Sequence, residues 1–295
     1  MNFTGKVVGI NTSDGMYNLN VSDELKNSIN LKITLELGSK IKIGHVYSFE
    51  YETTYHNERS NNNVISYVST DELELNERNN VLRTFYQQSP LSLEESIAEV
   101  NKYIELINND VIKSVTKGLI TKYYDKFFIY PAASKMHHAY VGGLAHHCIG
   151  MLHFADGFIE NYPYLNKDYV YAGILLHDIG KALELNGVIN TEYTLKGQMI
   201  GHLVLGAMQI ETMATELGLQ NCEEVMVLEH MLVSHHGMPQ FGSAKKPMTA
   251  EALVLWYIDT IDSKFRVLGE ELNKTEQGTY TENIGVLDRQ KIYKA

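Results

Sequence analysis

The hydrophobic pattern changes its period near residue 71, and this change limits the chain to two differently built parts. Before that point, short runs rich in β-branched and aromatic residues favour strands. The runs are KVVGI (6–10), YNLNV (17–21), LKITLEL (31–37), HVYSFEYETTY (45–55) and VISYV (64–68). Turn-prone segments such as NTSDG and HNERSNNN separate them. The sequence therefore predicts a small antiparallel β module at the N-terminal end.

Beyond residue 71 the apolar spacing becomes helical. Ser92–Glu95 has the pattern of a capping box, and the stripe that follows it consists of Ile97, Val100, Ile104 and Ile107. After Pro131 the pattern predicts helices over roughly 139–161, 167–183, 196–217, 221–236 and 248–272. We therefore expect a multi-domain α+β protein. Its four parts would be a β module (1–70), a helical connector (71–130), an all-α domain (131–272) and a tail packed on that domain (273–295).

Five short strands in the first 70 residues suit a five-stranded barrel of the OB-fold type, a frequent binder of single strands. By period-2 alternation Tyr47, Phe49 and Tyr51 share one face. These aromatics either fill the barrel or, as Tyr47 and Tyr51 would on a binding surface, stack on bases. The first interpretation is favoured, because aromatic side chains are so often buried. Six basic and seven acidic residues leave this segment a net charge of −1, which offers no basic surface for nucleic acid.

Composition excludes several classes of protein. The net charge of −11 argues against a surface that holds nucleic acid by general electrostatics, although a local groove stays possible. No apolar run approaches the roughly 20 residues of a membrane span, and the N-terminus lacks a signal-peptide pattern. Cys148 and Cys222 are too few for a disulfide framework. We expect a cytoplasmic protein with no membrane partner; a homo-oligomer stays open.

The segment AGILLHDIGK (172–181) places His177 and Asp178 among residues that favour a dry interior. An unpaired buried charge is costly, so Asp178 requires a hydrogen-bonded partner or a metal ion. Ten of the 12 histidines fall between residues 137 and 236, and clustered histidines indicate metal weakly.

Helical spacing decides which histidines face inward. His147 shares a stripe with Leu144 and Met151, whereas His146 lies off it. On the next helix, His177 shares a face with Ile174. Other candidates in inward or helix-end settings are His202, His235, His236 and Asp259. Each alone is more often a hydrogen-bonded core residue, but together they would be served by one pair of divalent cations, and imidazole and carboxylate suit Mn, Fe, Co, Ni or Zn.

The order His147, His177-Asp178, Asp259 resembles the HD superfamily of metal-dependent phosphohydrolases. The resemblance is closest to the YhaM-type 3′→5′ exoribonucleases, which join an OB-fold to an HD domain. The segments that carry it are PAASKMHHAYVGGLAHH (131–147), HDIGK (177–181), SHHGMPQFGSAKKP (234–247), EALVLWYIDTIDSK (251–264) and GTYTENIGVLDRQKIYK (278–294). The resemblance thus covers nearly the whole chain. Over residues 1–70 it consists only of the expected barrel architecture and not of sequence motifs.

The resemblance implies a role for each candidate residue. One ion would be held by His147, His177, Asp178 and Asp259, with helical phase favouring His147 over His146 as the first ligand. Asp178 would bridge to a second ion held by His202, His235 and His236. Lys181, one turn beyond His177, would contact the scissile phosphate. Lys135, His138, Lys245 and Lys246 are either further phosphate contacts or solvated surface residues.

Three functions follow as alternatives. The first is a metal-dependent 3′→5′ exonuclease that releases nucleoside monophosphates from single-stranded RNA or DNA, using two ions, Mn²⁺ foremost. The second is an HD phosphohydrolase for cyclic dinucleotides or nucleoside triphosphates. The third is a non-catalytic nucleic-acid-binding protein with a structural metal, against which the apparent completeness of the ligand set and Lys181 argue.

Overall fold

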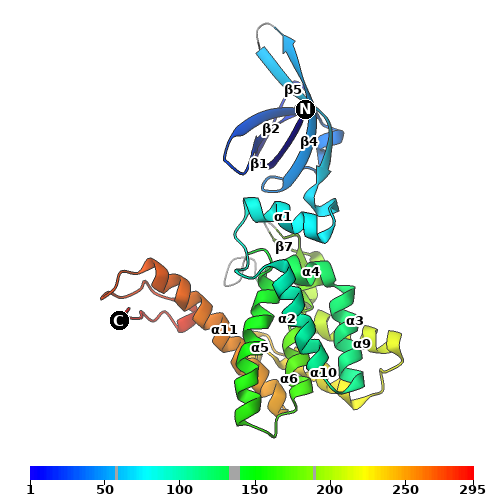
Figure 1. Cartoon of the computed structure of the whole chain (residues 1–295), viewed down its shortest axis with the longest axis vertical. Helices are drawn as coiled ribbons and strands as arrows, with labels where there is room; N and C mark the ends of the chain where they lie inside the picture. The colour runs from blue at the N-terminus through cyan, green and yellow to red at the C-terminus, as the bar shows by residue number, and fades with distance from the viewer. Residues whose placement is uncertain (57–58, 133–139, 189–190) are drawn as a thin grey trace. The chain divides into compact units, whose positions relative to one another are not determined.

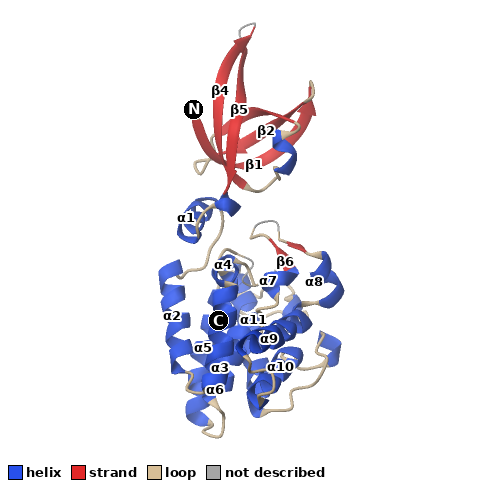
Figure 2. Ribbon diagram, turned by 90° about the vertical axis from the view of Figure 1, so that its right-hand side faces the viewer, coloured by secondary structure: helices blue, strands red, loops and turns tan. Residues whose placement is uncertain are grey.

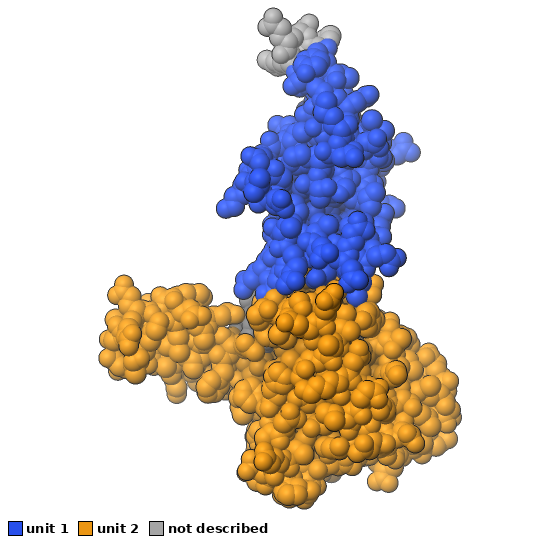
Figure 3. All heavy atoms as spheres, in the orientation of Figure 1, with its two compact units in different colours: residues 1–88 blue, residues 89–295 orange. Residues whose placement is uncertain are grey.

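The computed structural model describes residues 1–56, 59–132, 140–188 and 191–295. The chain divides into two compact units, residues 1–88 and 89–295 (Figure 3). The first is built on strands and the second almost wholly from helices (Figures 1 and 2). The α+β architecture expected from the change in hydrophobic period is confirmed.

The first unit is a five-stranded barrel. Its strands are β1 (Asn2–Ser13), β2 (Met16–Ser22), β3 (Ser28–Thr34), β4 (Val46–His56) and β5 (Arg59–Ser69). Antiparallel pairing joins β1 to β2 and β4, β2 to β3, and β4 to β5. One parallel pair, Lys32 with Asn63, completes the circle β1-β2-β3-β5-β4. This strand order is the one expected of an OB-type barrel.

Alternation along each strand fills the barrel with apolar side chains. The buried cluster consists of Val7, Leu19, Val21, Leu31, Ile33, Ile41, Tyr47 and Phe49. Tyr47 is only 3% exposed, and its hydroxyl accepts a hydrogen bond from the Lys42 amide at 3.0 Å. This corrects the substrate-binding role considered for Tyr47, because a ring enclosed in the core cannot stack on a base. Tyr51 is partly buried against the same cluster, and its role stays a prediction.

The second unit is a helical bundle. Its helices are α2 (Leu93–Leu106), α3 (Asp110–Lys122), α4 (Tyr124–Ile129), α5 (Gly143–Asn161), α6 (Lys167–Leu176), α7 (Lys181–Glu184), α8 (Leu195–Ile200), α9 (His202–Leu217), α10 (Glu223–Ser234) and α11 (Ala250–Lys274). The capping box is confirmed, since the Ser92 and Glu95 side chains each accept a backbone hydrogen bond at the start of α2. None of the helices in the described ranges combines the length and apolar character needed to cross a bilayer.

The unit boundary falls inside the segment expected to be a connector. Helix α1 (Leu75–Phe85) belongs to the first unit, and α2, α3 and α4 belong to the second, where they pack against α5, α6 and α9. The boundary at residue 88 therefore differs from the two boundaries, at 70 and 130, drawn from the sequence. The four-part division stays a proposal about functional segments.

Helix α6 lies at the centre of the second unit, where α3, α5, α10 and α11 pack against it. Its own residues are almost all buried, as its apolar sequence requires. Several helix ends meet at one place: α6 ends at Leu176, α9 begins at His202 and α10 ends at Ser234. The candidate site is built at this meeting point.

After α11 the chain folds back as a C-terminal hairpin (residues 278–294). Bridges pair Tyr280 with Tyr293 and Ile284 with Gln290. The Lys294 ammonium donates to the carbonyl oxygens of Leu272 and Thr275 at 2.7 and 2.8 Å, which ties the end of the hairpin to the C-terminal end of α11. The short helix η4 (Gly285–Leu287) of this hairpin contacts α11.

Candidate metal centre

The His177-Asp178 doublet lies in a tight turn rather than inside a helix. The expected helix over 167–183 stops at Leu176, and α7 begins only at Lys181. This turn requires a glycine at position 180, because a Cβ there would lie 2.1 Å from the His202 carbonyl oxygen. The start of α9 therefore packs directly on this turn. The glycine thus allows His202 to lie close to the doublet.

Seven of the predicted residues meet around Asp178, in two groups. In the first, possible ligand atoms of His147, His177 and Asp178 lie within 4.8 Å of one another. The Asp259 Oδ1 atom is 3.2 Å from His147 Nε2 and adjoins this group. In the second, those of His202, His235 and His236 also lie within 4.8 Å of one another.

The Asp178 carboxylate stands between the two groups and is only 4% exposed. One oxygen, Oδ2, is 3.3 Å from His177 Nε2. The other, Oδ1, is 3.4 Å from His202 Nε2 and 4.0 Å from His235 Nε2. A carboxylate with one oxygen toward each group has the geometry of a bridging ligand.

The histidine rings are fixed through Nδ1. The Nδ1–H groups of His177 and His235 each donate to a backbone carbonyl oxygen three residues earlier, both at 2.7 Å. That of His236 donates to the Phe241 carbonyl at 2.8 Å. Because a carbonyl oxygen only accepts, these bonds place the ring proton on Nδ1 and leave the Nε2 lone pair for another partner.

The Nε2 atoms show that the residues present fit metal ions. Those of His177, His202 and His235 are buried, and within the described part of the chain they make no hydrogen bond. Buried polar atoms without partners are rare in proteins and require an explanation. Neutral imidazole and carboxylate donors are ligands for divalent transition ions. Two such ions would give every orphaned nitrogen a partner.

The electrostatics of the two groups differ. Burial, aided by the charge of neighbouring histidines, holds the pKa of His235 well below its usual range and so keeps this ring neutral. At His147 burial acts in the same direction, but hydrogen bonds and charge from Asp259 and Asp262 outweigh it and raise its pKa to about 9. A cation beside Nε2 would replace the proton held there, since a ligand must offer its lone pair.

Lys181 points into the same centre. Its ammonium group lies 2.6 Å from Asp178 Oδ2, and the side chain is mostly buried. Burial disfavours the charged form, yet the Asp178 carboxylate outweighs it and raises the pKa of this lysine. Lys181 is therefore a fixed cation at the edge of the centre and not a solvated surface lysine.

Two supporting carboxylates were missed in the sequence. Asp262 Oδ2 accepts from His147 Nδ1 at 2.7 Å, and Glu184 accepts from His202 Nδ1 at 3.0 Å. Both carboxylates belong to residues that are themselves buried. Metal-binding histidines usually donate their second ring nitrogen in this way. The available signal was spacing, because each lies three residues after a residue already selected, Asp259 and Lys181.

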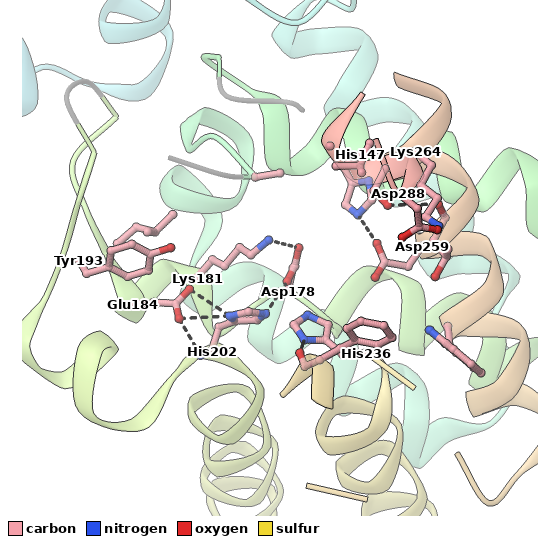
Figure 4. Close-up of a pocket in the computed structure, with 18 residues that line it drawn as sticks. His147, Asp178, Lys181, Glu184, Tyr193, His202, His236, Asp259, Lys264 and Asp288 are labelled. Carbon is pink, nitrogen blue, oxygen red and sulfur yellow. Dashed lines mark hydrogen bonds and ion pairs between the residues drawn. The ribbon is translucent and has the colours of Figure 1, made fainter. Parts of the chain in front are cut away.

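The centre opens onto a pocket of about 760 Å³. Figure 4 shows Lys181, Glu184, Tyr193 and His202 on one side, and His147, Asp259, Lys264 and Asp288 on the other. Aromatic rings of Phe241 and Trp256 also line the pocket. An enclosed structural metal site would have no such space beside it, so the arrangement is that of an accessible reaction centre.

The remaining predicted residues are placed as follows. His146 is buried and hydrogen-bonds through Nδ1 to the Tyr140 hydroxyl at 2.5 Å, and it belongs to neither group of possible ligands in the described ranges. Lys245 and Lys246 are exposed and are not among the described residues that line the pocket. Lys135 and His138 lie outside the described residues. The phosphate-binding roles of these four stay predictions.

Comparison with known proteins assigns the class. Residues 144–264 match the model of the HD domain family, and this range contains both histidine groups, Asp178 and Asp259. This part of the chain is therefore an HD domain, as its motif order predicted.

A curated relative extends the likeness. The chain is 41% identical over 210 residues to the 3′-5′ exoribonuclease YhaM of Geobacillus sp. (strain WCH70). The match covers 71% of this chain and 64% of the relative. The predicted resemblance to YhaM-type HD proteins is confirmed over that length.

Proposed function

We propose that this protein is a metal-dependent 3′→5′ exonuclease that hydrolyses single-stranded RNA to nucleoside monophosphates, with single-stranded DNA as a second substrate. One observation carries the proposal: two groups of possible metal ligands share Asp178 and open together onto one pocket. The activity of the YhaM relative supports the same reaction. We place the reaction in the cytoplasm.

In this proposal His147, His177, Asp178 and Asp259 hold one ion, and His202, His235 and His236 hold the other with Asp178 between them. Mn²⁺ is proposed as the native metal, with Fe, Co, Ni or Zn compatible with the same donors. When bound, a pair of divalent ions aligns the attacking and leaving oxygens and neutralises the charge that develops on the phosphate.

The side chains of the pocket supply the rest of the chemistry. The Lys181 ammonium, held by Asp178 at 2.6 Å, is placed to donate to a non-bridging oxygen of the scissile phosphate. Asp262 and Glu184 keep His147 and His202 in orientation by accepting their Nδ1 protons. Tyr193 and Phe241 are 49% and 62% exposed, and their rings offer stacking faces for bases.

The barrel is proposed to guide a single strand toward the helical unit. Its strand order is that of folds which often bind oligonucleotides. Tyr47 is buried in the barrel core, so a binding surface there would depend on other side chains, such as the exposed Tyr55.

The test is to incubate the metal-loaded protein with 5′-labelled single-stranded RNA, and in parallel with cyclic dinucleotides and nucleoside triphosphates. A ladder that shortens from the 3′ end is expected. Turnover of the small nucleotides alone would replace the proposal with a small-nucleotide phosphohydrolase. No turnover with any of the five metals would indicate a structural metal site.

A further inference from the structure

The C-terminal hairpin supplies one wall of the pocket. Gly285, Val286 and Asp288 line it from this hairpin, beside Ser263 and Lys264 of α11. Figure 4 shows Asp288 on the same side of the pocket as Lys264 and Asp259. The donor groups and Lys181 explain how a phosphate would be handled, but they leave the purpose of this wall unexplained.

The hairpin tip is held firmly in place. Ile284 and Thr281 are buried. The Ile284 N–H donates a hydrogen bond to the Gln290 carbonyl oxygen at 3.0 Å. The Arg289 N–H also donates to the Ile284 carbonyl at 3.0 Å. These contacts give Asp288 a defined position, which a residue that recognises part of a substrate requires.

Asp288 lies in the turn at the tip of the hairpin. Asp288 and Arg289 have φ values of 54° and 60°, in the left-handed region where glycine is the least strained residue. Within the described ranges the Asp288 carboxylate makes neither a hydrogen bond nor an ion pair, although it lines the pocket. Asp288 is also exposed, so it presents an available carboxylate beside the reaction centre.

We propose that Asp288 recognises the unphosphorylated 3′ end of the substrate by accepting hydrogen bonds from the 2′- and 3′-hydroxyl groups of the terminal ribose. This inference rests on the proposed nuclease function and deepens it. An ionised carboxylate accepts hydrogen bonds and donates none, so it pairs with a diol. It also repels a terminal phosphate, which Lys264 on the same wall would by itself attract. Asp288 thereby makes the pocket selective for a 3′-hydroxyl end.

The first measurement compares degradation rates of one 5′-labelled RNA with three different 3′ ends: a ribose, a 2′,3′-dideoxyribose and a 3′-phosphate. The native protein should degrade the ribose end about tenfold or more faster than each of the others. Asp288→Ala should remove most of both preferences. Asp288→Asn keeps one acceptor oxygen without the charge, so it should relax the discrimination against phosphate more than the preference for ribose. The matched control is Glu282→Gln, an exposed carboxylate of the same hairpin that does not line the described pocket.

The second measurement separates this inference from the nuclease proposal. Binding of adenosine 5′-monophosphate, its 2′,3′-dideoxy form and adenosine 3′,5′-bisphosphate is measured by calorimetry with Mn²⁺ present. Selectivity for the monophosphate that Asp288→Ala abolishes supports the inference even where RNA is not cleaved, in which case only the nuclease proposal fails. Equal affinities, no binding at all, or unchanged selectivity in Asp288→Ala would overturn it.

Discussion

The interiors of the two units are filled in opposite ways. The barrel core contains aliphatic and aromatic side chains, with the Tyr47 hydroxyl paired to a backbone amide. In the described part of the helical unit, three histidines and two aspartates are buried almost completely: His147, His177, Asp178, His235 and Asp262. All five lie in or beside the two groups of possible ligands.

This difference shows which interior is built for stability. Burying apolar surface stabilises a fold, whereas burying charge costs free energy unless partners or ions compensate. The barrel should therefore be stable through packing alone. In the helical unit the buried charged and polar groups at the centre lower the free energy of unfolding. Bound cations would raise it again, because they bind only the folded site. Four comparisons between variants test this contrast.

Asp178→Asn should have the largest effect, because it removes the carboxylate that both ligand groups share. Cleavage of RNA should fall at least about 10³-fold, and the metal content per chain should drop. Elemental analysis and the 3′-end ladder measure the two effects. Asp156→Asn is the matched control, since that carboxylate accepts from Tyr103 and Tyr171 on the outer side of α5. A variant that keeps both ions and full activity would refute the ligand assignment.

Phe49→Ala tests the barrel core. Deleting this fully buried ring should cost about 3–5 kcal/mol of unfolding free energy, measured by denaturant titration of the barrel transition. Metal content should stay unchanged, and degradation of long RNA should suffer more than cleavage of dinucleotides if the barrel guides the strand. The control Ile65→Ala, on a side chain 53% exposed, should change stability by less than about 0.5 kcal/mol. Equal losses on both substrates would leave the barrel a structural role only.

Asp262→Ala and Glu184→Ala test the carboxylates that orient His147 and His202. Each should weaken metal affinity by about 10–100-fold, because the ring then loses its fixed orientation and tautomer. Metal titration followed by calorimetry measures the change, with Asp156→Ala as the control. If metal affinity is unaffected in both variants, the hydrogen bonds to Nδ1 serve packing rather than the centre.

Two glycines of α5 give the smallest and most local comparison. A Cβ at Gly150 would lie 2.9 Å from Asp262 Oδ1, whereas a Cβ at Gly157 would meet nothing within 4 Å. Gly150→Ala should therefore displace Asp262 and weaken metal affinity about threefold to tenfold, less than its removal does. Gly157→Ala should leave affinity unchanged and stabilise the helix by about 0.5–1 kcal/mol. The same affinity in both variants would show that Asp262 adjusts freely.

The local pattern of the chain predicted most of the architecture. Short runs of β-branched and aromatic residues predicted the five strands, and the Ser92–Glu95 pattern predicted the start of α2, because both signals lie within a few neighbouring residues. It did not predict the boundary of the compact units at residue 88, since the association of α1 with the barrel depends on contacts far apart in sequence, such as the hydrogen bond from the Tyr86 hydroxyl to the Gly44 carbonyl.

For the centre, the sequence by itself determined the residue types: buried imidazoles and carboxylates at helical spacing, in an order that resembles the HD family. Only the tertiary structure decided their division into two groups with Asp178 between them, the support from Asp262 and Glu184, and the approach of Asp288. The physical reason is distance along the chain. Helical periodicity tells which way a side chain faces, but which side chains meet depends on how α5, α6, α9, α10, α11 and the C-terminal hairpin pack together.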